Sequence, residues 1–351
     1  MKSLLAALLA LLTSYTPLST HATVPSRQLA GQRVIYSYAG LTPPESLLAH
    51  IRDGEAAGVI FFKENIAGPD QIRAVTAQLN AANTSGVPLL LMTDQEGGLV
   101  RRLPGAPELS QKQIGQSADP VRAAEEAGTT AGENLRGVGM NVNLAPVLDV
   151  YRQPGDFMDQ SQRSYSTDPA VVAVLSRGFV TAQQRITGVA ATAKHFPGIG
   201  SAAAQENTDA VPVTLNVPLQ TLRTVDELPY TAGAKLIMLS WAVYPALDAQ
   251  RPAGLSPTVI KNELRGNLHF SGVTVSDAIE AGALQAYGST AQRSVAAAGA
   301  GVDLILCSAR DVRQGEDAVT GMLNALSGGQ LDEADFTAAV QRVTSLRIGL
   351  G

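Results

Sequence analysis

The chain of 351 residues contains only one cysteine, Cys307, so it cannot form an intramolecular disulfide. Charged residues are also few, at 16%, and Lys and Arg are not clustered anywhere. With 26 basic against 31 acidic residues, the formal net charge is −5. A chain without a positive stripe has no surface that could track a phosphate backbone, and we therefore expect no nucleic-acid partner.

Long apolar runs are also missing. The run LLAALLALL near the start covers residues 4–12 and is too short to span a bilayer. It follows Lys2 and leads into the small residues of STHA (19–22), which is the pattern of a secretory signal peptide. We predict a signal peptide over residues 1–22 and a secreted or periplasmic protein. No cysteine stands directly after the predicted cleavage site, so we expect no lipid anchor, and we expect no integral membrane segment after cleavage.

Short apolar runs recur along the rest of the chain, separated by segments whose apolar residues lie three and four positions apart. The runs are RVIYSYAG (33–40), GVIFF (58–62), PLLLMTD (88–94), MNVNLAPVLDV (140–150), ATAKHFPG, KLIMLSWAVY (235–244), GVTVSDA (272–278) and VDLILCSA (302–309). Such alternation indicates an α/β protein with a parallel sheet covered on both sides. Eight strands predict a single (β/α)8 TIM-type barrel over residues 23–351. An open doubly wound sheet is the competing fold, but no glycine-rich phosphate loop follows the first run.

Charged residues follow four of these runs, where the active site of such a barrel lies. They are Asp94 with Glu96, Asp149, Lys194 with His195, and Asp277. Any one of them is as often a structural hydrogen-bonding group as a functional one. Four strand ends together favour a concave polar site.

Longer motifs surround the same positions. They are TDQEGGLVRRLPGAP (93–107), LAPVLDV (144–150), RSYSTDP (163–169), AKHFPGIG (193–200), VYPALD (243–248), LSPTVIKNELR (255–265) and GVTVSDAIEAGAL (272–284). In this order, over roughly residues 30–350, the chain resembles glycoside hydrolase family 3, and specifically its single-domain bacterial β-N-acetylglucosaminidases. The resemblance implies a retaining hydrolase that removes terminal β-linked N-acetylhexosamine from peptidoglycan or chitin fragments, and the signal peptide predicts that it is exported. It implies no cofactor and no metal, and we expect a monomer whose partner is carbohydrate.

The resemblance also implies a role for each matching residue. Asp277 corresponds to the nucleophile, whose carboxylate would form a covalent glycosyl-enzyme intermediate. Asp94 would accept hydrogen bonds from sugar hydroxyls. The other residues expected to bind the sugar are Arg102, Arg163, Lys194, His195, Met238 and Trp241. Cations near Asp277 are expected to oppose its protonation. Trp241 could stack on a sugar face or only fill space above the barrel.

The sequence departs from this family where a proton donor is needed. The branch takes its donor from an Asp-Ser-His trio in the loop after the Lys-His strand. Here Gln205, Glu206 and Asn207 hold those places, and Ile199 replaces a nearby histidine. Further departures are Leu99, Ala278 and Trp241, where the family often has Arg, Asp and His.

Three interpretations follow. In the first, Glu206 acts as the acid/base, with its proton affinity raised by burial. In the second, the donor is lost, which typically costs about 10²–10⁴-fold in rate, and only activated sugars are cleaved. In the third, the barrel is a secreted protein that binds sugars or cell-wall fragments without turnover.

Overall fold

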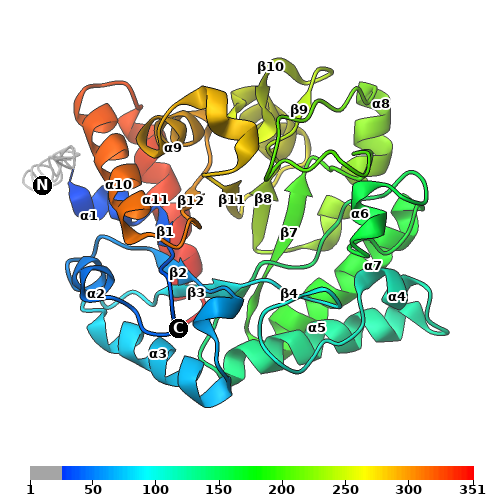
Figure 1. Cartoon of the computed structure of the whole chain (residues 1–351). Coiled ribbons are helices and arrows are strands. Elements are labelled where there is room, and N and C mark those ends of the chain that lie inside the picture. Colours follow the sequence, from blue (N-terminus) through cyan, green and yellow to red (C-terminus); the bar gives the residue numbers. More distant parts are fainter. Residues whose placement is uncertain (1–25) are drawn as a thin grey trace, which may run out of the picture.

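Eight parallel strands close into a barrel in the order β1-β12-β11-β8-β7-β6-β3-β2 (Figure 1). The structure is a computed structural model that describes residues 26–351, so the predicted signal peptide lies outside the described residues. The barrel strands are β1 (Val34–Tyr36), β2 (Gly58–Ile60), β3 (Leu90–Thr93), β6 (Val142–Asn143), β7 (Ala190–Phe196), β8 (Leu236–Leu239), β11 (Val273–Ala278) and β12 (Leu304–Leu306). The predicted (β/α)8 fold is confirmed.

Each predicted apolar run contributes one barrel strand, but several of these strands are shorter than their runs. The run 140–150 forms only the two-residue strand β6. Pro146 lies in this run and has no N–H to donate to a neighbouring strand. Beyond it, Val147 forms only an isolated bridge with Lys194. The rest of the run is therefore free to carry Asp149 to the end of the barrel.

Helices surround the strands (Figure 1). The α-helices are α1 (Arg27–Gly31), α2 (Glu45–Arg52), α3 (Pro69–Ala82), α4 (Gln111–Gly115), α5 (Pro120–Gly137), α6 (Phe157–Gln160), α7 (Pro169–Ala182), α8 (Leu219–Thr221), α9 (Thr290–Ala300), α10 (Val312–Ser327) and α11 (Glu333–Ile348). Short 3-10 or π-helical segments cover Lys63–Asn65, Gln183–Thr187, Leu222–Asp226, Leu228–Ala232, Ala253–Leu255, Thr258–Asn267 and Gly282–Tyr287. Among residues 26–351, no helix is long and apolar enough to cross a membrane.

An Asp-Pro pair begins α5 and α7. Asp119 accepts a hydrogen bond from the backbone N–H of Arg122, and Asp168 accepts one from that of Ala170. The proline that follows each aspartate needs no partner for an N–H and already has the φ of a helix. The pair in the motif RSYSTDP therefore fixes the start of α7, directly after the loop that holds Arg163.

Successive residues of a strand point to opposite sides of the sheet, and this divides the core into two layers. In β8, Leu236 and Met238 belong to the cluster inside the barrel, whereas Ile237 and Leu239 pack in the layer beneath the helices. Cys307 is a buried thiol in the outer layer.

Two antiparallel hairpins are added to the barrel. One joins β4 (Gln95–Gly97) to β5 (Val100–Arg101), directly after β3. The other joins β9 (Val243–Tyr244) to β10 (Asp248–Pro252), after β8. Since both follow the carboxyl ends of barrel strands, they lie on the same side as the predicted site.

Candidate active site

A cavity of about 370 Å³ lies where the barrel strands end. Its apolar lining includes Leu144, Met238 and Leu306, which also belong to the cluster inside the barrel. Its polar lining is formed by Asp94, Arg102, Arg163, Lys194, His195, Asp209, Asp277, Glu280, Ser308 and Arg310. The structure thus brings together all the predicted site residues except Glu206 and Trp241, which do not line the cavity.

Lys194 in β7 bridges the buried carboxylate of Glu96 and the half-buried carboxylate of Asp94. Its Nζ lies 2.7 Å from Asp94 Oδ1 and 2.8 Å from Glu96 Oε1. Burial alone would raise the pKa of Asp94, but the charges of Lys194 and Arg102 outweigh it, and the pKa lies below its usual value. Burial likewise opposes the charge on Lys194, yet the two carboxylates raise the pKa of that amine. Asp94 is therefore a fixed anionic acceptor for hydroxyl groups in the cavity.

Arg163 also pairs with Glu96, and it shares the Oε1 atom with Lys194. Its Nε and one terminal nitrogen each lie 2.9 Å from a carboxylate oxygen of Glu96, which is the bidentate geometry. Burial would raise the pKa of Glu96, but Arg163 and Lys194 lower it to about 2. The backbone N–H of Arg163 donates to Met158 O at 3.0 Å, which ties the arginine to α6. The guanidinium is therefore held rigidly at the edge of the cavity.

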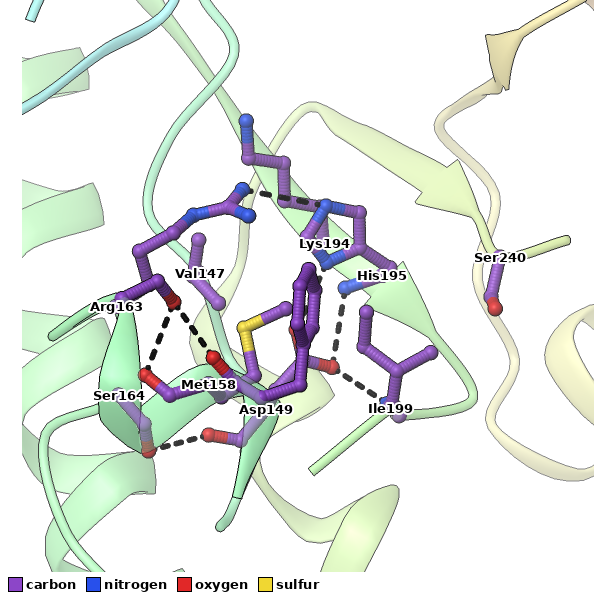
Figure 2. A network of polar contacts seen from close by, with 12 residues as sticks. Val147, Asp149, Met158, Arg163, Ser164, Lys194, His195, Ile199 and Ser240 are labelled. Atoms are coloured by element: carbon purple, nitrogen blue, oxygen red, sulfur yellow. Dashed lines mark hydrogen bonds and ion pairs between the residues drawn. The ribbon is translucent and has the colours of Figure 1, made fainter. Parts of the chain in front are cut away.

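His195 is held by Asp149 (Figure 2). Its Nδ1 lies 2.8 Å from Asp149 Oδ2, and its Nε2 lies 3.5 Å from a terminal nitrogen of Arg163. Because a carboxylate only accepts, the proton of the ring belongs on Nδ1, and Nε2 is left as an acceptor facing the guanidinium. When the ring is neutral, its one proton is therefore engaged by Asp149, and Nε2 faces Arg163.

The same aspartate also fixes the loop after β7. Asp149 Oδ1 accepts hydrogen bonds from the backbone N–H of Ile199 at 2.8 Å and of His195 at 3.3 Å, and Ser164 Oγ donates to the Asp149 carbonyl at 2.6 Å (Figure 2). The Ile199 side chain is buried in the outer core layer. Since the contact to Asp149 uses the backbone of Ile199, an apolar side chain at this position preserves it.

Asp277, at the end of β11, lines the cavity without an ion pair to any residue in 26–351; the backbone N–H of Ala278 donates to its Oδ1 at 2.8 Å. Burial raises the pKa of Asp277, and the nearby charge of Asp209 adds to this, whereas His195 and Lys194 act in the opposite direction. His195 and Lys194 thus oppose the protonation of Asp277, as expected, but burial and the charge of Asp209 outweigh them. Lys194 is also paired with two carboxylates of its own.

Trp241 lies outside the cavity. The side chain is 1% exposed, and its Nε1 donates to the Ala278 carbonyl oxygen at 2.9 Å. A Cβ on Gly254 would come within 2.4 Å of the indole ring, so the ring packs directly on that backbone. This placement favours the packing alternative and connects the tryptophan to the strand end that carries Asp277.

The loop after β7 places Glu206 and Asp209 differently. Glu206 turns back on its own loop, where its Oε2 accepts a hydrogen bond from the backbone N–H of Ala203 at 2.7 Å. Asp209 lines the cavity together with Asp277. The structure therefore does not bring the predicted candidate Glu206 into the cavity, whereas Asp209, three residues further along, lines it.

Sequence reasoning did not assign Glu280 or Arg310 to the site. Glu280 accepts a 2.6 Å hydrogen bond from Ser308 Oγ, and the guanidinium of Arg310 lies 3.8 Å from the centre of the Phe62 ring. Glu280 follows Asp277 by three residues, and this proximity was a usable signal. For Arg310 there was no such signal, because this residue lies in a short loop after β12. Within residues 26–351, no three His, Cys, Asp or Glu side chains are grouped to hold a metal ion.

Comparison with known proteins shows to which protein family the chain belongs. The model of the glycosyl hydrolase family 3 N-terminal domain matches residues 28–346. An uncharacterized secreted glycosyl hydrolase of Arthroderma benhamiae is 46% identical over 327 residues, covering 91% of this chain and 92% of that protein. A beta-hexosaminidase of Xylella fastidiosa is 35% identical over 301 residues, covering 82% and 87%. The chain therefore belongs to glycoside hydrolase family 3.

Solved structures of similar proteins indicate which members of this family the chain resembles. A family 3 beta-N-acetylglucosaminidase from Paenibacillus sp. superposes with a TM-score of 0.86 at 31% identity, over 92% of this chain. This chain spans only 62% of that longer protein. A beta-N-acetylhexosaminidase from Beutenbergia cavernae superposes with a TM-score of 0.80 at 32% identity, over 92% of this chain and 96% of that one. The protein is thus a glycosyl hydrolase of the β-N-acetylhexosaminidase-like kind.

Proposed function

We propose that the protein is an exported retaining glycoside hydrolase that removes terminal β-linked N-acetylhexosamine through a covalent glycosyl-Asp277 intermediate. The position of Asp277 carries this proposal. It is a half-buried carboxylate with no ion pair in residues 26–351, and it shares a cavity with Asp94, Lys194 and Arg163. A carboxylate without a cation of its own is free to attack the anomeric carbon and to stabilise the positive charge that develops there.

The terminal sugar would lie against the charged wall of the cavity. Asp94 accepts hydrogen bonds from hydroxyls, while Lys194, Arg163 and His195 hold their own positions through Glu96 and Asp149. A volume of about 370 Å³ is near the lower end of the range of about 300–1,000 Å³ for small-molecule sites, which suits a single sugar ring with part of its neighbour. The names of the relatives support N-acetylhexosamine as that sugar, and fragments of peptidoglycan or chitin are the substrates that contain it.

Export is supported by the signal-like residues 1–22 and by the secreted relative from Arthroderma benhamiae. Outside the cell, the enzyme would act on wall fragments without any need for their uptake.

A second function is favoured by one observation. In the described chain, His195 is the sole histidine that lines the cavity, and its ring is committed to Asp149 and Arg163. If no other group donates a proton, the same cavity would bind a sugar without cleaving it.

Hydrolysis of an aryl β-N-acetylglucosaminide decides between these functions. The proposal expects turnover by the wild-type protein, a first-formed product with the β configuration by NMR, and no turnover by Asp277→Ala. Binding of N-acetylglucosamine without any turnover, weakened in Asp94→Ala, would instead establish the binding protein. A first-formed α product would contradict the retaining mechanism.

A further inference from the structure

We propose that Asp209 is the general acid/base of this enzyme, the group that gives a proton to the departing oxygen and later takes one from water. This inference rests on the proposed function, since it assumes that Asp277 is the nucleophile. Asp209 is not part of the motifs that define the family resemblance. We assign the role to Asp209 because the fold places its carboxylate in the same cavity as Asp277.

The backbone of Asp209 is attached to the segment that follows the nucleophile. The Asp209 carbonyl accepts a 2.8 Å hydrogen bond from Gly282 N–H, and the Thr208 carbonyl accepts a 3.1 Å bond from Ala283 N–H. A Cβ on Gly282 would lie 2.1 Å from the Ala210 carbonyl oxygen, so only glycine permits this close approach. The loop is therefore docked beside β11, and the two carboxylates are held at one site by backbone contacts.

The Asp209 carboxylate is also free. It has no hydrogen-bond or ion-pair partner among residues 26–351, and the residue is exposed on the solvent side of the site. An acid/base must reach a leaving group that lies toward solvent, and it must lose and regain a proton without breaking a salt bridge. Asp209 meets both requirements in the structure as it stands.

Each other acidic group of the cavity has a different task. Asp94 is paired with Lys194, and Glu280 accepts hydrogen bonds from Ser308 Oγ at 2.6 Å and Gln314 Nε2 at 3.0 Å. Glu206 bonds the backbone of its own loop. Apart from Asp277, Asp209 is thus the acidic residue lining the cavity whose carboxylate is not already bound by another residue of the described chain. Electrostatics agrees, because the charge of Asp209 raises the pKa of Asp277, which places the two acids close enough to interact.

The reaction balances with these two residues alone. In the first step, an Asp277 oxygen bonds to the anomeric carbon, the glycosidic bond breaks, and its electron pair goes to the leaving oxygen, which takes the proton of Asp209. Asp277 is then a neutral ester and Asp209 an anion. In the second step, the Asp209 carboxylate takes a proton from water as the water oxygen bonds to the anomeric carbon. The ester bond breaks, its electrons return to Asp277, and Asp209 is protonated again.

The test compares leaving groups and adds an external nucleophile. For Asp209→Ala, we expect kcat/KM on N,N′-diacetylchitobiose to fall by about 10²–10⁴-fold, because that sugar needs a proton to depart. The value for a 2,4-dinitrophenyl glycoside should change by less than about tenfold, because this leaving group needs no proton. The glycosyl-enzyme should then accumulate, giving a burst of dinitrophenol, and azide should restore turnover by forming the β-glycosyl azide.

The variant Glu206→Ala tests the competing assignment in the same loop. The proposal is overturned if Glu206→Ala shows the dependence on leaving group and the rescue by azide, or if Asp209→Ala loses activity equally on both substrates in a protein whose circular dichroism and melting are those of the wild type. Failure of the proposed function looks different. In that case the wild type cleaves neither substrate, or Asp277→Ala remains active.

Discussion

The indole Nε1 of Trp241 donates a 2.9 Å hydrogen bond to the carbonyl oxygen of Ala278, the residue next to Asp277. A buried ring that packs on Gly254 thereby fixes the strand end that carries the proposed nucleophile. Trp241 is thus a positioning residue: its bond holds the carbonyl of Ala278, the residue whose own N–H donates to Asp277 Oδ1.

Replacing Trp241 with Phe keeps most of the ring but removes the hydrogen bond. We expect kcat to fall by about 10–100-fold, because small displacements of a reacting group are costly, while KM changes by less than about threefold. Steady-state kinetics on the 2,4-dinitrophenyl glycoside measures the separation. A large rise in KM with an unchanged kcat would mean that the tryptophan contacts the sugar instead.

Glu96→Gln should destabilise the fold, because Lys194 and Arg163 would lose the carboxylate they share in a buried place. A loss of about 2–4 kcal/mol in the free energy of unfolding is expected from urea denaturation. The matched control is Asp335→Asn, which breaks an exposed pair with Lys261 and should cost no more than about 1 kcal/mol. Equal losses in both variants would contradict the role of Glu96 as the centre of the charge network.

The acid limb of the pH–rate profile should report Asp277, which must be ionised to attack. Since burial and the charge of Asp209 raise the pKa of Asp277, activity should begin to fall at a pH above the usual range of an aspartate. Asp209→Asn removes a negative charge, so it should move this limb to lower pH. The profile of kcat/KM is measured on the 2,4-dinitrophenyl glycoside, where no proton donor is needed. A limb that stays in place would show that the two carboxylates do not interact.

A separate pH effect is expected on stability. Asp226 is fully buried beside Gly198 and bonded to Arg152 at 2.5 Å, and burial raises its pKa to about 7. Between about pH 4 and pH 7, the folded protein keeps a proton on Asp226 that the unfolded chain has released. The stabilisation from this group is therefore complete below about pH 4 and is lost as the pH rises through 7. The full loss should be on the order of 4 kcal/mol, of which about 2–3 kcal/mol falls between pH 5 and 7.

Urea denaturation of wild type and Asp226→Asn between pH 5 and 8.5 measures this loss. The wild type should lose stability more steeply than the variant, which has no carboxyl to titrate. Parallel curves would assign the pH dependence to other groups.

The barrel and half of the site could be predicted from local sequence. Eight apolar runs gave eight strands, and the polar residues directly after them, such as Asp94, Lys194 and Asp277, meet in one cavity because parallel strands end on the same side. Their positions follow from strand periodicity, which is a local property of the chain.

The other half depends on contacts between distant segments. Glu206 and Asp209 are three residues apart, and the choice between them is made by the bonds of Thr208 and Asp209 to Ala283 and Gly282. Trp241 is turned away from the cavity by its contacts with Ala278 and Gly254. No pattern within either loop encodes such contacts, since they depend on how two loops pack.

The most direct test of the central claim is mass spectrometry of Asp209→Ala, quenched in acid during the burst with the 2,4-dinitrophenyl glycoside of N-acetylglucosamine. We expect the intact protein to gain one N-acetylhexosaminyl residue, and the fragments of the digested protein to locate it on Asp277. A protein that releases dinitrophenol without gaining this mass, or that carries the sugar on another residue, would contradict the covalent mechanism.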